Sequence, residues 1–144
     1  MPRAMAVRGV RGATTVPRNE ATAVVERTLE LLQLLVASNG IEPADVASAI
    51  FTVTDDLDAE FPAAAARALP GWNQVPLLCA REAPVPGSLG LCVRVLLHWN
   101  TDRAQGDVRH AFLRGARELR PGWAVRVPGD DDEPPTPRIP GRRN

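Results

Sequence analysis

The octapeptide CVRVLLHW at residues 92–99 decides the fold of this 144-residue chain. It has the character of a β-strand, yet apolar residues stand on both of its faces, with Arg94 and His98 as the exceptions. A strand that is apolar on both faces belongs inside a sheet that is covered on both sides. Arg94 is then a charged side chain in apolar surroundings, so it needs an acceptor or an opposite charge in the protein or in a ligand.

Outward from this strand, the pattern predicts an α+β (mixed α/β) domain with a single mixed β-sheet and two main helices. We expect strands at about residues 7–16, 48–54, 74–80, 91–99 and 108–113. The first helix is expected to follow an N-cap at Asn19 and to end at Asn39-Gly40, and the second to run from about Asp58 to Leu69. These helices cannot cover both faces of the sheet, so closed homo-oligomerisation is expected to cover the second face.

The ends of the chain differ from its middle in composition. Residues 1–5 are expected to be a disordered N-terminal extension, and residues 6–122 to form the domain. Residues 123–144 are rich in proline and in charges, with the acidic run Asp130-Asp131-Asp132-Glu133. Such a segment has too few apolar side chains to offset the entropy of ordering it, so we expect a disordered tail.

The composition excludes several classes of function. The formal net charge is +0, which gives no general electrostatic reason to bind nucleic acid or an anionic membrane, and no apolar run approaches the ~20 residues of a membrane span. The chain contains no lysine, which excludes a Schiff-base enzyme and a P-loop nucleotide enzyme. Cys79 and Cys92 form no Cys-x-x-Cys pair and no secretory signal is visible, so a reduced, cytoplasmic protein is expected. The two histidines have no metal-ligand spacing, and no metal or other cofactor is expected.

Two more charged residues share the apolar surroundings of Arg94. Glu82 closes the run VPLLCARE at residues 75–82, and Arg11 lies in VRGVRGATT at residues 7–15. One glutamate cannot balance two arginines, so a bound anion is the natural missing partner. Because the guanidinium fork fits carboxylate oxygens two at a time, these residues predict a small acidic substrate.

Six segments, in order, make the chain resemble the AroH-type monofunctional chorismate mutases, the trimeric enzymes of the Bacillus type. They are VRGVRGATT (7–15), FTVTDDL (51–57), AEFPA (59–63), VPLLC (75–79), RVL (94–96) and LRP (119–121). The resemblance covers roughly residues 6–122. It implies a trimer whose sheets pack into a pseudo-α/β-barrel, with active sites in the clefts between neighbouring subunits. It also implies the Claisen rearrangement of chorismate to prephenate in phenylalanine and tyrosine biosynthesis, without a cofactor.

The resemblance assigns roles to the charged residues. Arg94 donates to the ether oxygen of the substrate, where negative charge builds as the bond to the ring breaks. Glu82 accepts a hydrogen bond from the ring hydroxyl and orients Arg94, and Arg11 binds a carboxylate. Catalysis is then electrostatic stabilisation with conformational restriction, and no covalent step is needed. Further substrate-binding positions implied by the resemblance are Phe61, Ala63, Arg67, Leu77, Leu78, Cys79, Phe112, Leu119 and Arg120.

One geometric question stays open at this point. Cys79 and Glu82 fall on opposite faces of a regular strand, yet the family uses both. Either the strand kinks near Ala80, or Cys79 contributes largely through its backbone. The chain also departs from the family pattern at three positions, with Phe112 in place of the usual tyrosine, Ala64 in place of lysine and Leu78 in place of threonine.

Two other functions are compatible with a trimeric anion site. One is a non-catalytic trimeric module that binds a small anion, and the other is a trimeric deaminase of the YjgF type. The presence of Arg11, Glu82 and Arg94 together argues against the first, and the segments VPLLC and AEFPA have no reason to occur in the second. An assay for the loss of chorismate absorbance separates the three.

Overall fold

The computed structural model describes residues 4–141 and, within them, one mixed five-stranded sheet. Its strands are β1 (Ala6–Thr15), β2 (Val46–Val53), β3 (Leu77–Arg81), β4 (Cys92–Thr101) and β5 (Ala111–Phe112), in the order β3-β2-β4-β1-β5. The central strand β4 runs antiparallel to β1 and β2, while β2 pairs with β3 and β1 pairs with β5 in parallel. The predicted single mixed sheet is therefore confirmed, with the stretch at residues 92–99 in its central strand.

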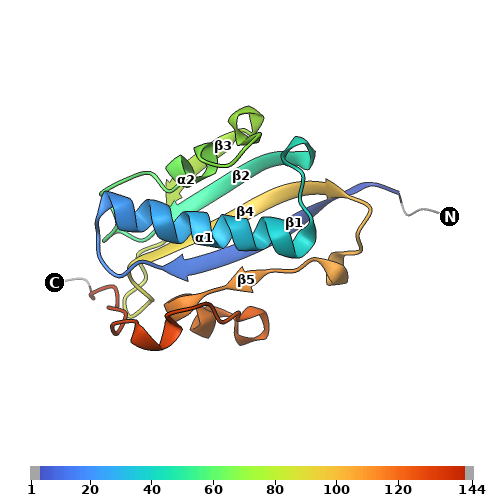
Figure 1. Cartoon of the computed structure of the whole chain (residues 1–144). Helices are drawn as coiled ribbons and strands as arrows, with labels where there is room; N and C mark the ends of the chain where they lie inside the picture. Colours follow the sequence, from blue (N-terminus) through green and yellow to red (C-terminus); the bar gives the residue numbers. More distant parts are fainter. Residues whose placement is uncertain (1–3, 142–144) are drawn as a thin grey trace.

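The helix α1 (Ala21–Asn39) lies along one face of this sheet, and the short helix α2 (Ala63–Arg67) lies beside it, near β3 (Figure 1). The remaining helical turns are η1 (Pro43–Asp45), η2 (Trp72–Gln74), η3 (Gln105–Asp107), η4 (Arg114–Leu119), η5 (Pro121–Trp123) and η6 (Asp130–Asp132). α1 ends at Gly40 in the left-handed conformation, with φ 70°, as the sequence predicts. In the part of the chain that the structure describes, no helix has the length and apolar character needed to cross a membrane.

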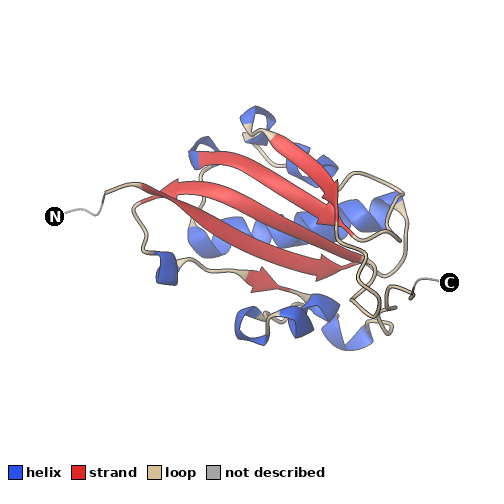
Figure 2. Ribbon diagram, turned by 180° about the vertical axis from the view of Figure 1, so that it is seen from behind, coloured by secondary structure: helices blue, strands red, loops and turns tan. Residues whose placement is uncertain are grey.

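The main core lies between α1 and the sheet. Leu31, Leu32 and Leu35 of α1 pack in one buried cluster with Phe51 of β2 and Val95 of β4. The opposite face of the sheet has no helix over it in the described chain, as Figure 2 shows from behind. Side chains on this open face, such as Leu96 and His98, are only half-buried, and Val7 is 57% exposed. This confirms that the helices of one chain cover only one face.

Three predicted elements differ in the structure. Asn19 is not the helix N-cap: Glu20 flanks α1, and the Asn19 side chain accepts hydrogen bonds from the backbone N–H groups of Asp58 and Ala59. The second helix begins only at Ala63 because the residue before Pro62 is disfavoured in a helix. The fifth strand shrinks from residues 108–113 to Ala111–Phe112.

The C-terminal segment also differs from its prediction. Residues 123–141 are packed onto the domain, whereas we expected disorder from residue 123 onward. Glu133 forms ion pairs with Arg114 and Arg27, and Arg114 is bound on its other side by Glu30 at 2.9 Å. Ile139 is 7% exposed, and it exchanges backbone hydrogen bonds with the loop at residues 87–88. One of the charges that suggested a solvated tail, Glu133, is thus a partner of the buried Arg114. Residues 1–3 and 142–144 of the predicted disordered ends lie outside the described residues.

Candidate active site

The open face of the sheet brings together the three charged residues that the sequence singled out. In the strand ladders, Arg94 of β4 lies opposite Ala13 of β1 and Thr52 of β2. Arg11 of β1 lies two residues from Ala13, on the same face. Glu82 follows β3 directly, and its N–H donates to the carbonyl of Val53 at 2.8 Å, which extends the pairing with β2 by one residue. Alternation along four adjacent strand segments therefore places all three charges on the same side of the sheet.

Glu82 is held by one hydrogen bond and one ion pair. The Thr52 hydroxyl donates to Glu82 Oε2 at 2.7 Å. Arg94 Nε lies 3.7 Å from the same oxygen, which is an ion-pair distance but too long for a good hydrogen bond. Within residues 4–141, the buried Nε of Arg94 has no hydrogen-bond partner. A buried donor without an acceptor destabilises the fold, so the Nε–H of Arg94 is the group in this site that is expected to donate to a bound ligand.

The space beside these charges is a cavity of about 280 Å³. The charged residues and several apolar residues of the sheet line it: Arg11, Ile50, Thr52, Glu82, Arg94, Val95 and Leu96. Burial lowers the pKa of Arg11, and the charges of Arg94 and Arg120 lower it further, while Glu82 raises it. Three arginines around one glutamate leave an excess of positive charge, which suits an anion with more than one carboxylate.

A second cavity, of about 560 Å³, lies along the edge strand β3 and before α2. It is lined on one side by Asp58 to Pro62, including Phe61, and on the other by Cys79 to Arg81. The pairing of β3 with β2 is continuous from Leu77 to Arg81, so the strand has no kink near Ala80. Cys79 and Glu82 therefore do point to opposite faces, and the site residues of one chain fall into two separate groups.

The other predicted substrate-binding residues are spread over the chain. Leu78 lies on the open face and is 61% exposed, and Arg67 is exposed at the end of α2. Arg120 is exposed, with its guanidinium carbon 3.6 Å from the centre of the Trp123 ring. The remaining positions are packed within the single chain: Ala63 and Leu77 belong to the main core, and Phe112 and Leu119 pack with Ala116 and Trp123. Contact of these residues with substrate stays a prediction.

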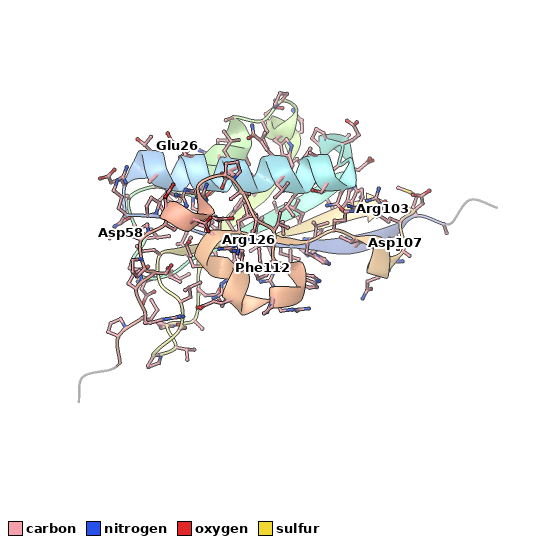
Figure 3. The ribbon with its side chains drawn as sticks, turned by 60° about the horizontal axis from the view of Figure 1, so that its bottom comes forward. Glu26, Asp58, Arg103, Asp107, Phe112 and Arg126 are labelled. Carbon is pink, nitrogen blue, oxygen red and sulfur yellow. The ribbon has the colours of Figure 1, made fainter. Side chains whose placement is uncertain are left out.

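Figure 3 views the end of the molecule where Phe112 lies among the helical turns of residues 114–123. The Phe112 ring is 2% exposed, and the Arg11 guanidinium carbon lies 5.8 Å from its centre. Phe112 thus supports Arg11 from beneath. The Phe112 ring also packs against Trp123, with the ring centroids 5.8 Å apart.

Sequence reasoning missed two side chains that shape this site. Thr52 holds Glu82, but its place opposite Arg94 depends on the strand register, which the sequence does not specify. Trp123 stands at the first position of the expected tail, yet its ring stacks on His110 with centroids 3.9 Å apart.

The surroundings of the two histidines do not resemble a metal site. His98 is hydrogen-bonded to the hydroxyl of Ser48, and His110 accepts a hydrogen bond from the backbone N–H of Arg11. Among residues 4–141, no group of three histidine, cysteine or acidic side chains could hold a metal ion.

The chain is similar to several known proteins. The family model described as chorismate mutase type I matches residues 7–123. Chorismate mutase AroH of Thermus thermophilus is 53% identical over 116 residues, covering 80% of this chain and 94% of the relative. Chorismate mutase AroH of Bacillus subtilis is 41% identical over 121 residues, covering 84% and 95%. The solved structure of a chorismate mutase from Clostridium thermocellum superposes with a TM-score of 0.75 at 50% identity, covering 77% of this chain and 98% of that one.

Proposed function

Because the chain belongs to the chorismate mutase type I family, we propose that its reaction centre is the charged cavity formed by Arg11, Glu82 and Arg94. The protein is an intramolecular isomerase of aromatic amino acid biosynthesis that rearranges chorismate, and the alternatives of a binding module and a deaminase are set aside. The observation that carries the assignment is the buried Nε of Arg94, which has no partner within residues 4–141. A cytoplasmic location belongs to the same proposal, since both thiols are free.

Arg94 acts where charge develops in the reaction. In the Claisen rearrangement the ether bond breaks while a carbon–carbon bond forms, and electron density gathers on the ether oxygen in the transition state. A guanidinium N–H that is already held in place stabilises this oxygen more in the transition state than in the ground state. The ion pair from Arg94 Nε to Glu82, at 3.7 Å, orients the guanidinium but is too long to take up the Nε–H in a good hydrogen bond.

Glu82 and Arg11 hold the substrate in the reactive conformation. Thr52 occupies Oε2 of Glu82, so we assign Oε1 to the ring hydroxyl of chorismate. Arg11 and Arg120 supply the excess positive charge for the carboxylates. Fixing the ends of the substrate brings the bond-forming carbons together, which lowers the barrier to the rearrangement of a flexible molecule.

The complete site is shared between chains of a homotrimer. Phe61 is 65% exposed and lies with Cys79 at a cavity of its own, apart from the charged cavity of the same chain. The open face of the sheet, with Val7 and Leu78 exposed, is the surface that a neighbouring chain would cover. A ring of three chains would place the Phe61 cavity of one chain against the Arg94 cavity of the next. Sedimentation equilibrium is expected to give three times the 15.5 kDa chain mass, and an active monomer would refute this arrangement.

The experiment that tests the reaction centre is the loss of chorismate absorbance with Arg94→Ala and Arg94→Lys. Removing the charge-assisted donor is expected to cost roughly 3–5 kcal/mol of transition-state stabilisation, or on the order of a hundred- to several-thousand-fold in turnover. The lysine variant is expected to be poor as well, because a point charge cannot replace the fork. Near-normal turnover of a folded Arg94→Ala protein at saturating chorismate would remove Arg94 from the mechanism.

A further inference from the structure

We propose that His110 is a positioning residue for Arg11: its ring nitrogen replaces a missing strand partner and fixes the backbone that carries the carboxylate-binding guanidinium. This inference rests on the proposed role of Arg11 in binding substrate.

The hydrogen bond arises where β5 is too short. The parallel pairing of β1 with β5 consists of Gly12 with Ala111 and Ala13 with Phe112. Arg11 lies one residue before this ladder, and its backbone N–H donates to His110 Nδ1 at 2.9 Å. A backbone N–H inside a sheet needs an acceptor. The imidazole supplies it from a side chain, so the edge of β1 stays fixed at Arg11 although β5 begins only at Ala111.

The imidazole is itself held in place. Its ring stacks on Trp123 with the centroids 3.9 Å apart and the planes tilted by 34°. The Trp123 ring centroid lies 5.8 Å from that of Phe112, and the guanidinium carbon of Arg120 lies 3.6 Å from the centre of the Trp123 ring. Arg11, His110 and Trp123 together line a cavity of about 570 Å³. The rings thus connect the two arginines assigned to the substrate carboxylates, Arg11 and Arg120, through a single stack.

Only the neutral ring can accept the bond. Because Nδ1 is the acceptor, the proton of the neutral imidazole must be on Nε2, and an imidazolium has no acceptor left. Burial lowers the pKa of His110 from its ordinary 6.5, and two cations near the ring, Arg120 beyond η4 and Arg11 on β1, lower it further. The contact is therefore fully present above about pH 6.5 and is lost as the pH falls through the lowered pKa.

The test uses two variants of His110 and measures KM and kcat for chorismate from pH 5 to pH 8. His110→Asn keeps an acceptor near the position of Nδ1 but does not titrate, whereas His110→Leu removes the acceptor and keeps apolar bulk. We expect His110→Leu to raise KM on the order of tenfold at every pH, with a much smaller loss of kcat, since the contact acts through substrate binding. The KM of the wild type is expected to rise at low pH, and that of His110→Asn to stay low and flat.

Three results would overturn the proposal: a KM of His110→Leu equal to that of the wild type at pH 7.5, a loss confined to kcat, or a wild-type pH dependence of KM that His110→Asn retains. If His110→Leu does not fold, the comparison of the wild type with His110→Asn still decides. A direct second measurement is the ¹⁵N spectrum of the histidines, of which the chain has two. The signal that disappears in His110→Asn should show the Nε2–H tautomer, and the Nδ1–H tautomer would contradict the geometry.

Arg11→Ala separates this inference from the site assignment. If Arg11→Ala raises KM but His110→Leu does not, the role of His110 is wrong and the site stands. If Arg11→Ala leaves KM unchanged, the assignment of Arg11 to a substrate carboxylate is wrong, whatever His110 does.

Discussion

Glu82 is held by Thr52 as well as by Arg94. The ion pair of Glu82 with Arg94 is 3.7 Å long and partly exposed, a geometry that contributes little stability by itself. The shorter contact is the 2.7 Å hydrogen bond from Thr52, which lies directly opposite Arg94 on β2. The Thr52 hydroxyl is neutral, so it holds the Glu82 carboxylate without balancing its negative charge. Because Glu82 stays 3.7 Å from Arg94 Nε, that N–H has no strong acceptor there.

Removing this anchor is expected to weaken catalysis without unfolding the protein. Thr52→Val deletes a charge-assisted hydrogen bond worth roughly 1.5 kcal/mol, so kcat/KM for chorismate should fall about tenfold. Thr52→Ser is the matched control, because it keeps the hydroxyl and should stay near the wild type. Steady-state kinetics on the two proteins make the comparison. Equal kinetics of the valine variant and the wild type would show that Glu82 does not depend on Thr52.

The sequence predicts the strands and α1 because their apolar residues repeat at clear spacings, and it predicts the three charges because each interrupts such a run. It does not predict that β5 stops at two residues, because a histidine ring can substitute for a strand partner. Nor does it place Thr52 beside Glu82, since register is a tertiary property. The reaction is predicted by the resemblance of the six segments to a known family. The charged residues by themselves predict only that the ligand is small and acidic.

The contact of α1 with the sheet depends on a glycine in β1. A Cβ added at Gly12 would lie 2.9 Å from a methyl carbon of Leu35 and 3.0 Å from one of Leu31, both fully buried. Gly12→Ala is therefore expected to lower the free energy of unfolding by roughly 1–3 kcal/mol through overpacking. Urea denaturation measures this effect.

Gly106→Ala is the control for this prediction. Its added Cβ would have no atom within 4 Å, and Gly106 does not have positive φ. Its stability should stay within about 0.5 kcal/mol of the wild type. If Gly12→Ala were as stable as Gly106→Ala, the helix would pack on β1 with more room than the structure gives it.

At the scale of the whole molecule, the C-terminal segment joins parts that are distant in sequence. Glu133 binds Arg27 of α1 and Arg114 of η4, while Asp130 accepts from the N–H of Val127. Residues 137–139 pair with the loop at residues 87–90, which leads from Glu82 into β4. The composition of this segment predicted disorder, because proline and acidic residues offer little burial. In the structure Glu133 instead pairs with the buried Arg114, a contact that composition cannot reveal.

We therefore expect a chain that ends at Trp123 to be less stable than the full chain. Removal of Glu133 leaves Arg114, whose side chain is 8% exposed, with one carboxylate fewer, and Ile139 no longer covers the loop at residues 87–90. The loss is estimated at roughly 2–4 kcal/mol and should appear as a lower Tm.

Two point variants test the cause. Glu133→Gln should reproduce part of the loss, whereas Asp131→Asn should not, because the side chain of Asp131 is 94% exposed. An unchanged Tm for both the truncated chain and Glu133→Gln would mean that residues 124–141 add nothing to the fold.

The claim that each reaction centre is built from two chains is tested most directly by trimers of mixed composition. Arg94→Ala and Phe61→Glu chains, each inactive alone, are co-expressed with different tags, and the molecules that carry both tags are assayed for loss of chorismate. In a ring of three chains, either mixed composition has one cleft with an intact Arg94 and an intact Phe61 from the next chain. The account predicts about one third of the wild-type turnover per trimer. Mixed trimers with no activity would place Arg94 and Phe61 of the same chain in one site and would contradict the shared reaction centre.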